Sequence, residues 1–298
     1  MKTVFVTGAT GTIGSVTVDE LLKKGYKVIG LAKSEGSADK LRAKGCGVIM
    51  GDLNDKDALR KGATEADGVI HLAFIPDYEH MDRCLKVDKQ ASAVMLEAMK
   101  GTNKPFVNIV GTLVLSNESG TPSDENTPYS KASGFGERAI NEQAALDFAK
   151  QGVRAMSVRF PPTVHGMGDT RAWIPALVKS CHDNGVSIYI GKGENRWPAV
   201  NLEDAANFLV LALENGKPGK KYNCIGETGI PFKNIAVAIA SKQILPIKTM
   251  RVEEASKYLG FLAYVMAMDC PTLSDISQKE LGWTPTHNTL QQDIADYY

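Results

Sequence analysis

Three glycines near the start of the chain have the spacing of a turn that binds phosphate groups. Gly8, Gly11 and Gly14 follow an apolar run at residues 2–6 and open a segment of helical periodicity that ends at Gly25. The first glycine permits a tight turn, the second lets a pyrophosphate approach the backbone, and the third lets the helix pack against the strand. An ordinary strand-to-helix turn is the alternative. The predicted dinucleotide contacts are Gly8, Thr10, Gly11, Thr12, Ile13 and Gly14.

The end of the second expected strand indicates which dinucleotide binds. An NAD site usually carries Asp or Glu there, about 20 residues after the glycines, to hold the ribose 2′-hydroxyl. This chain has Ala32, followed by Lys33 and Ser34, and a cation with a hydroxyl suits a 2′-phosphate. We therefore predict NADP. The alternative is that Lys33 is solvated and Glu35 holds NAD.

The elements that must position these residues alternate between strand and helix patterns. Strands are expected at residues 2–6, 27–31, 47–50, 68–72, 104–110 and 153–159, and helices at 13–25, 38–44, 56–62, 78–100 and 137–150. Short apolar strands with helical crossovers form a parallel sheet, so the fold class is α/β. Ligands of such sheets bind outside the carboxyl ends of the strands.

Composition limits the partners and the compartment. The 34 Lys and Arg side chains balance the 34 Asp and Glu side chains, so no net field attracts nucleic acid or an anionic membrane. The five cysteines form no Cys-x-x-Cys pair, and the five histidines lack metal-ligand spacing. We expect no signal peptide, because the apolar run at residues 2–6 belongs to the first strand, and no apolar stretch approaches the roughly 20 residues of a membrane-spanning helix. We expect a cytoplasmic protein without a metal, whose partner is a small-molecule substrate.

Five motifs occur in order along the chain: TGATGTIG at 7–14, GDLND at 51–55, HLAF at 71–74, RFPPTVHGMGD at 159–169 and NRWPAVNLEDAA at 195–206. Together they resemble the extended and atypical short-chain dehydrogenase/reductases, also called the NAD-dependent epimerase/dehydratase family, over nearly the whole chain. PPTVHG with NRWPAV is most similar to an atypical subgroup. The resemblance implies a chemistry class more than a substrate.

The resemblance also implies a domain organisation. Residues 1–160 would form the NAD(P)-binding domain, a Rossmann-type doubly wound parallel sheet. Beyond Pro161 the pattern becomes irregular, with helices expected at 173–184, 203–214, 232–241, 252–259 and 289–295. Residues 161–298 would form a smaller substrate-binding region that also returns elements to the core. Relatives suggest a homodimer through the helices at 78–100 and 137–150.

Several cofactor and substrate contacts follow from the same resemblance. The implied cofactor contacts beyond the glycine turn are Lys33, Ser34, Asp52, Leu53, Ala73, Phe74, Pro161 and Thr163. Asp52 would accept a hydrogen bond from the adenine amine, or it would cap the helix that begins near Asp55. His165 would shuttle a proton near the nicotinamide, or it is a satisfied structural histidine. Arg196 would hold a substrate diphosphate, or it pairs with Glu203 or Asp204.

The catalytic residues depart from the pattern of the family. Family catalysis uses a Tyr, a Lys four residues later on the same helical face, and an upstream Ser or Thr. Here Tyr129 and Lys131 are two residues apart, and Ser133 stands four after Tyr129. Either a loop distortion brings Tyr129 and Lys131 together over the nicotinamide, or the pair is lost and Tyr129 is a surface residue; we favour the second.

Counting back from Gly152 places the Tyr and Lys positions of the family nearer Gly134 and Arg138, and an Arg titrates too high to shuttle a proton. Thr112 occupies the Ser/Thr position and would bind a substrate carbonyl, or it serves a turn. Asp88 stands where the family often has Asn; it would hold a water or an active-site backbone group, or it lies on a solvated helix face.

These observations predict an NADP-dependent oxidoreductase that moves hydride between the nicotinamide and a small carbonyl or alcohol substrate. The altered Tyr and Lys spacing leaves two alternatives open: a non-catalytic NADP-binding sensor, and a nucleotide-sugar epimerase with retained NAD. The apolar segment at residues 261–268 would line a pocket for a hydrophobic substrate, or it is plain core.

Overall fold

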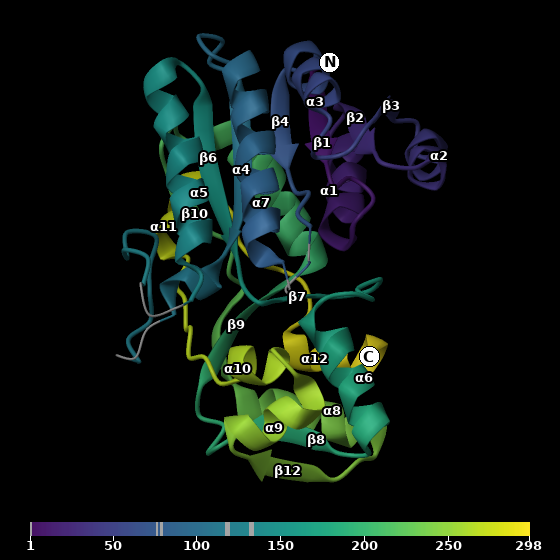
Figure 1. The fold of residues 1–298 in the computed structure, drawn as a ribbon, viewed down its shortest axis with the longest axis vertical. Coiled ribbons are helices and arrows are strands. Elements are labelled where there is room, and N and C mark those ends of the chain that lie inside the picture. Colours follow the sequence, from purple (N-terminus) through teal and green to yellow (C-terminus); the bar gives the residue numbers. More distant parts are fainter. Residues whose placement is uncertain (1, 76, 78–79, 117–119, 131–133) are drawn as a thin grey trace.

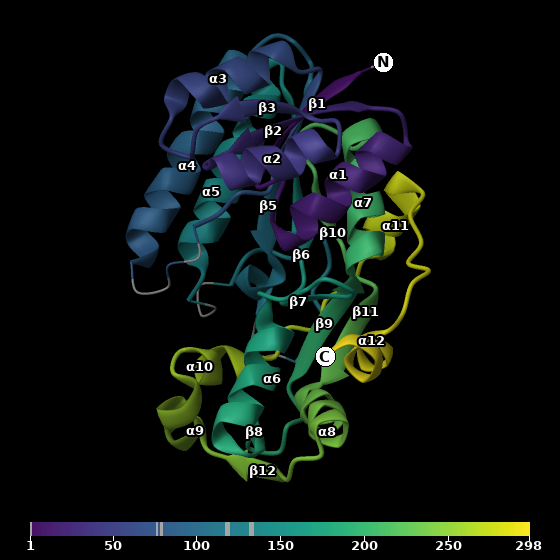
Figure 2. The ribbon, with the colours of Figure 1, turned by 90° about the vertical axis from the view of Figure 1, so that its right-hand side faces the viewer.

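The computed structural model describes residues 2–75, 77, 80–116, 120–130 and 134–298. A larger lobe holds a central sheet with helices on both faces, and a smaller lobe lies beyond the carboxyl ends of the central strands (Figure 1). The first residues of the chain belong to the larger lobe, whereas the last helix packs in the smaller one (Figure 2).

The central sheet has seven strands in the order β10-β6-β5-β4-β1-β2-β3. All pairs of neighbouring strands are parallel, as the crossover pattern predicted. The strands are β1 (Thr3–Thr7), β2 (Lys27–Ala32), β3 (Gly47–Met50), β4 (Gly68–His71), β5 (Pro105–Gly111), β6 (Arg154–Phe160) and β10 (Lys221–Asn223). The Rossmann-type fold class is confirmed.

Helices cover both faces of this sheet, because its strands are apolar on both sides. One face packs against α1 (Thr12–Lys23), α2 (Glu35–Ala43) and α7 (Leu202–Asn215). The other packs against α3 (Lys56–Glu65), α4 (Met81–Ala98) and α5 (Gly136–Leu146). Short 3₁₀ helices follow β5 at η1 (Thr112–Leu115) and α5 at η3 (Asp147–Gln151).

The smaller lobe has two small sheets and five helices among its described residues. β7 (Thr163–His165), β9 (Arg196–Asn201) and β11 (Glu227–Pro231) form one sheet, and β8 (Ser187–Ile190) pairs with β12 (Ile247–Met250) in the other. The helices are α6 (Trp173–Asn184), α8 (Phe232–Gln243), α9 (Val252–Leu259), α10 (Leu262–Met266) and α12 (Leu290–Tyr297). A separate apolar core holds this lobe together.

The second half of the chain returns to the central sheet. α7 packs on the face covered by α1, β10 pairs with β6, and α11 (Asp275–Leu281) packs near them. The helix expected at 137–150 is divided, because its last turn tightens into η3 before the left-handed Gly152. Sequence periodicity missed α10 and α11, which have only five and seven residues.

The described part of the chain contains no candidate membrane span and no candidate metal site. None of its helices combines the length and the apolarity that crossing a bilayer requires. No three potential ligands among its His, Cys, Asp and Glu side chains are grouped so that they could hold a metal ion.

Candidate active site

The glycine turn forms a backbone cradle between β1 and α1. Gly8 has a positive φ of 68°, and a Cβ atom there would lie 2.8 Å from the backbone nitrogen of Ala73. A Cβ atom at Gly14 would lie 2.0 Å from the carbonyl oxygen of Gly8. At Gly11 a Cβ atom would meet only that carbonyl, at 3.2 Å. Gly8 and Gly14 are therefore required by packing, whereas a Cβ at Gly11 would be a tight contact that only a small shift of the Gly8 carbonyl could relieve.

The first turn of α1 offers its N–H groups to a ligand. Gly11 is the N-cap residue, so no side chain caps the helix, and the first turn holds no acidic residue. Uncapped N–H groups at a helix start attract an anion. Thr10, Thr12 and Ile13 are partly exposed around the turn. A pyrophosphate fits this donor set, which supports the assignment of these residues to a dinucleotide.

The end of β2 presents a cation to solvent. Ala32 is fully buried, whereas Lys33 and Ser34 are exposed. No ion pair involves Lys33 within the described residues. Ser34 caps α2, because its Oγ accepts a hydrogen bond from the N–H of Ser37. Glu35, the alternative NAD contact, has its carboxylate 3.1 Å from the guanidinium of Arg42.

The hydrogen bonds of the segment after β3 decide between adenine binding and helix capping, the two roles that the sequence left open for Asp52. Asp55 is the residue that caps α3, since its side chain accepts from the N–H of Ala58 at 3.0 Å. Asp52 instead accepts from the N–H of Asn54 at 2.7 Å and remains exposed. Leu53 is buried. The helix-capping alternative for Asp52 is therefore wrong.

A hydrogen-bonded pair fixes the end of β4 against the glycine turn. The Oγ1 of Thr7 lies 2.6 Å from the Nδ1 of His71 and accepts from the N–H of Ala73 at 3.2 Å. These two contacts of the Thr7 hydroxyl join the end of β1 to the end of β4. The tie holds Ala73 beside Gly8, where the cofactor contact of residues 73 and 74 is expected.

Asp88 lies in a buried network between α4 and α5 rather than on a solvated face. Its carboxylate is 3.2 Å from Nη1 of Arg138, 3.3 Å from Nδ2 of Asn141 and 3.7 Å from Nε2 of His71. Burial alone raises the pKa of Asp88, but the facing His71 ring and the Arg138 guanidinium outweigh it and hold that pKa below its usual value. The solvated alternative for Asp88 is wrong.

Arg138 reaches from this network to the carboxyl edge of the sheet. Its Nη2 donates to the carbonyl of Ile109 at 3.1 Å, and its guanidinium lies 4.2 Å from the centre of the Phe74 ring. Arg138 is at the position that counting from Gly152 gave for the family lysine. The sequence places Arg138 and Asp88, but it gives no signal that they pair across two helices.

The proposed catalytic hydroxyls belong to Thr112, the first residue of η1, and Tyr129, in a loop that contacts η1. Thr112 is fully buried, and its Oγ1 has no hydrogen-bond partner among the described residues. The N–H of Ser130 donates to the carbonyl of Val114 at 2.8 Å, so the loop that carries Tyr129 lies against η1. The Tyr129 side chain is 41% exposed. Lys131, like Ser133, lies outside the described residues, and the Tyr129–Lys131 arrangement stays a prediction.

His165 has a structural environment. Its ring is fully buried, and its Nδ1 lies 2.6 Å from the carboxylate of Asp293 in α12, which also accepts from Asn201 at 2.9 Å. Burial lowers the pKa of His165 although Asp293 opposes this change. Because the ring is fully buried and its Nδ1 is engaged by Asp293, the geometry supports the structural alternative for His165.

Arg196 is also engaged, but with a different partner from the expected ones. Its Nη2 lies 2.7 Å from Oδ2 of Asp269 and donates to the carbonyl of Gly120. Glu203 and Asp204 instead contact His287, at 2.7 and 2.8 Å. The expected pairing of Arg196 with Glu203 or Asp204 is wrong, because Asp269 follows α10 and lies next to β9 in space.

The side chains of the segment after β6 are buried and not accessible to a ligand. Pro161 and Thr163 are both buried, and the hydroxyl of Thr163 donates to the carbonyl of Pro198. Any contact of this segment with a nicotinamide therefore falls to the backbone, as the resemblance implies.

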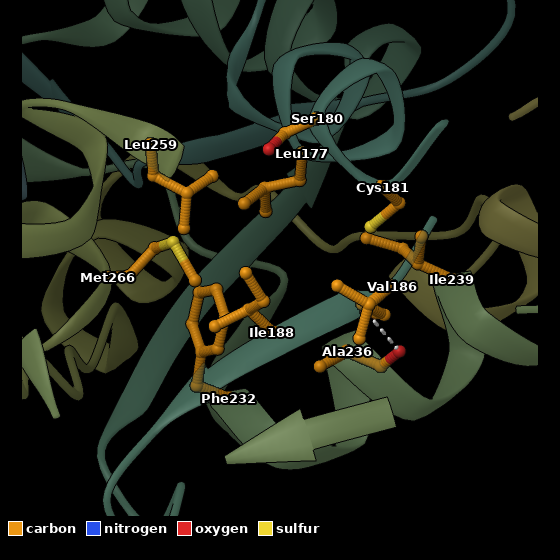
Figure 3. A pocket seen from close by; sticks show the side chains of 11 residues that line it. Leu177, Ser180, Cys181, Val186, Ile188, Phe232, Ala236, Ile239, Leu259 and Met266 are labelled. Carbon is orange, nitrogen blue, oxygen red and sulfur yellow. Dashed lines mark hydrogen bonds between the residues drawn. The ribbon is translucent and has the colours of Figure 1, made fainter. Parts of the chain in front are cut away.

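An interior cavity of the smaller lobe is not part of the site (Figure 3). It lies between α6, β8, α8 and the α9–α10 segment, and Leu177, Ile188 and Phe232 are among its apolar walls. Its free volume of about 10 Å³ is no larger than one water needs. It is a packing gap.

Known proteins carry the same succession of motifs. Residues 4–224 match the model of the NAD dependent epimerase/dehydratase family. The chain belongs to this family. Family membership makes the protein a nicotinamide-dependent enzyme of the oxidoreductase or epimerase kind.

Individual relatives cover almost all of the chain. The uncharacterized protein YLL056C of Saccharomyces cerevisiae is 42% identical over 298 residues, which are 99% of this chain and 98% of that protein. The decarboxylating sterol-4-alpha-carboxylate 3-dehydrogenase of Dictyostelium discoideum is 27% identical over 229 residues, 72% of this chain and 69% of that enzyme. The crystal structure of DesIV, a dTDP-glucose 4,6-dehydratase from Streptomyces venezuelae with NAD and TYD bound, matches with a TM-score of 0.80 at 17% identity. It covers 98% of this chain and 94% of that one, which shows the shared epimerase/dehydratase fold.

Proposed function

We propose that this protein is an NADP-dependent oxidoreductase that transfers hydride between the nicotinamide and a small carbonyl or alcohol substrate. The observation that carries the proposal is the pairing of two anion-binding features at one edge of the sheet. The uncapped start of α1 suits the pyrophosphate, and the exposed Lys33 after β2 suits a 2′-phosphate.

The surroundings of Lys33 favour NADP over NAD. Ala32 offers no carboxylate to the ribose 2′-hydroxyl, and Glu35 faces Arg42 on the exposed side of α2. A carboxylate turned toward the ribose would repel a 2′-phosphate, whereas Lys33 attracts it. Toward the ribose 2′-hydroxyl of NAD, the residues after β2 would offer the hydroxyl of Ser34 but no carboxylate.

The residues at the carboxyl edge have separate roles in this proposal. When bound, NADPH supplies the hydride. The Phe74 ring, held by Arg138, bounds the nicotinamide end of the site. The hydroxyl of Thr112, which has no partner among the described residues, holds the substrate oxygen. Tyr129, partly exposed on the loop against η1, gives that oxygen a proton only in the alternative that keeps the Tyr129–Lys131 pair.

The epimerase alternative has less support. A sugar-nucleotide substrate needs a free cation for its diphosphate, and Arg196, the residue at that position, is bonded to Asp269 and to Gly120. A sensor without turnover remains the outcome to exclude.

Isolation of the protein and identification of any retained nucleotide test the proposal. We expect protein without bound NAD that binds NADPH more tightly than NADH and oxidises NADPH when a neutral aldehyde or ketone is added. Tyr129→Phe should leave kcat and NADPH binding nearly unchanged, as for a surface residue; a fall in kcat of about 100-fold, the usual cost of removing a proton donor, would instead show that Tyr129 is the donor. Retained NAD with activity on UDP-glucose would establish the epimerase, and NADPH binding without oxidation across the panel would establish the sensor.

A further inference from the structure

A cavity of about 400 Å³ lies where the two lobes meet, on the α4–α5 side of the sheet. The starts of α4 and α5 form one wall, and the α10 segment of the smaller lobe forms the other. Its lining residues of interest are Leu85, Phe135, Glu137, Arg138, Phe261 and Tyr264. The volume is at the lower end of the range of about 300–1,000 Å³ found for small-molecule pockets.

The walls of the cavity are mainly apolar and aromatic. Leu85 and Val265 are buried beneath it, while Phe261 and Tyr264 keep about half of their side-chain surface exposed. Such half-exposed rings can bury further area against an apolar ligand, at about 25 cal/mol per Å². An apolar ligand would therefore gain from both walls.

The charges of the cavity disfavour an anion. Asp82 and Glu137 are exposed at its border. Arg138 is the one cation among the described lining residues, and its guanidinium already faces Asp88, the carbonyl of Ile109 and the Phe74 ring. Among the described lining residues, a phosphate or carboxylate would meet two acidic side chains and no cation without a partner.

The cavity also adjoins the proposed reaction centre. Arg138, in its wall, stacks on Phe74 at the nicotinamide end of the site. Phe135, also in its wall, packs against the cluster that contains Val114 and Leu115 of η1, the 3₁₀ helix that begins at Thr112. The cavity thus shares one wall residue with the Phe74 contact and another with the packing around η1.

We infer that this cavity binds the apolar part of a neutral substrate, an aromatic or branched aldehyde or ketone or the matching alcohol, and excludes anionic sugar nucleotides. The inference rests on the proposed function, since it assigns a substrate class to the same site.

Turnover of matched compounds tests the substrate class. With NADPH, kcat/KM for benzaldehyde should exceed that for 4-formylbenzoate, which differs by one carboxylate, by about tenfold or more, a ratio that corresponds to about 1.4 kcal/mol. It should also exceed that for acetaldehyde, which lacks the ring, and UDP-glucose should not react. Equal rates for the two aromatic aldehydes, or a preference for 4-formylbenzoate, would overturn the inference.

Two variants with a matched control locate the binding site. Tyr264→Ala should raise KM for benzaldehyde about fivefold and leave KM for acetaldehyde unchanged, because only the larger compound contacts the ring. Tyr258→Ala is the control, since Tyr258 is 47% exposed, close to the 53% of Tyr264, but lines a different groove beside α6. Glu137→Lys should shift the preference toward 4-formylbenzoate. The same KM in Tyr264→Ala and wild type would contradict the placement.

A binding measurement separates this inference from the proposed function. Saturation-transfer NMR of benzyl alcohol with the protein and NADP⁺ should show binding that Tyr264→Ala weakens and Tyr258→Ala does not. If no carbonyl compound is reduced but benzyl alcohol binds in this way, the proposed function fails and the cavity assignment stands. If NADPH is oxidised by carbonyl compounds but benzyl alcohol does not bind, the cavity assignment fails alone.

Discussion

At the scale of single residues, the glycine turn shows how backbone space serves binding. A Cβ at Gly8 or Gly14 would collide with other backbone atoms, whereas one at the exposed Gly11 would make a single tight contact with the Gly8 carbonyl. The sequence spacing predicts all three positions, because the motif states which glycine does which task. Substitution can therefore separate the packing role of Gly14 from the binding role of Gly11.

We predict different effects of alanine at Gly14 and Gly11. Gly14→Ala places a Cβ against the Gly8 carbonyl and should lower the free energy of unfolding by about 2 kcal/mol or more. Gly11→Ala should keep stability within about 1 kcal/mol of wild type, yet weaken NADPH binding about tenfold or more by intruding on the pyrophosphate. Urea unfolding and fluorescence titration measure the two effects. Unchanged NADPH affinity in Gly11→Ala would remove the pyrophosphate from this turn.

The residue after β2 allows a test of cofactor choice. Lys33→Glu should raise Kd for NADPH about tenfold or more and leave Kd for NADH nearly unchanged, because only the 2′-phosphate faces the new carboxylate. Lys61→Glu, an equal charge change on the exposed face of α3, should alter neither. Parallel titrations with both nucleotides measure the effect. Equal losses for NADPH and NADH in Lys33→Glu would contradict the assignment of NADP.

At the scale of elements, polar ties position the helices that bound the site. The buried network of His71, Asp88, Arg138 and Asn141 joins β4, α4 and α5. The sequence predicted the helices well, since their apolar periodicity is strong, but it could not predict this network. Its members are up to 70 residues apart by the numbering, and each one alone has an ordinary solvated interpretation.

Breaking the network should be costly. Asp88→Asn leaves the mostly buried Arg138 cation without its partner charge and should lower the free energy of unfolding by about 2 kcal/mol, less than for a fully buried pair. Asp39→Asn removes a partner from Arg42 at the similar distance of 2.9 Å on the exposed face of α2, and should give no measurable change. Chemical unfolding compares the two. Equal stability of both variants would show that the α4–α5 network is not structurally required.

The tie between β7 and α12 predicts a pH dependence. Burial keeps the pKa of His165 in the folded protein below its unfolded value of about 6.5, so the unfolded chain binds the additional proton first. Stability is therefore complete above about pH 6.5 and falls as the pH is lowered toward the folded pKa. Thermal unfolding measured at several pH values below about 6.5 should show a smaller loss of stability with falling pH in His165→Gln than in the wild-type protein. The same slope in both proteins would exclude His165 as its source.

At the scale of the whole molecule, the chain builds one lobe around a parallel sheet and a second lobe over its carboxyl edge (Figures 1 and 2). The fold class followed from the sequence, because strand and helix patterns alternate with the required spacing. The details of the second lobe did not, since α10 and α11 are short and the partners of Arg196 and His165 come from distant segments. Homodimerisation through α4 and α5 stays a prediction.

Hydride transfer itself is the most direct test of the account. NADPH deuterated at the transferable position of the nicotinamide should be incubated with the wild-type protein and benzaldehyde, and the alcohol product examined by mass spectrometry. The account predicts one deuterium in benzyl alcohol and an equal amount of NADP⁺. Tight NADPH binding with no labelled alcohol from benzaldehyde, or from any other neutral carbonyl compound, would contradict it.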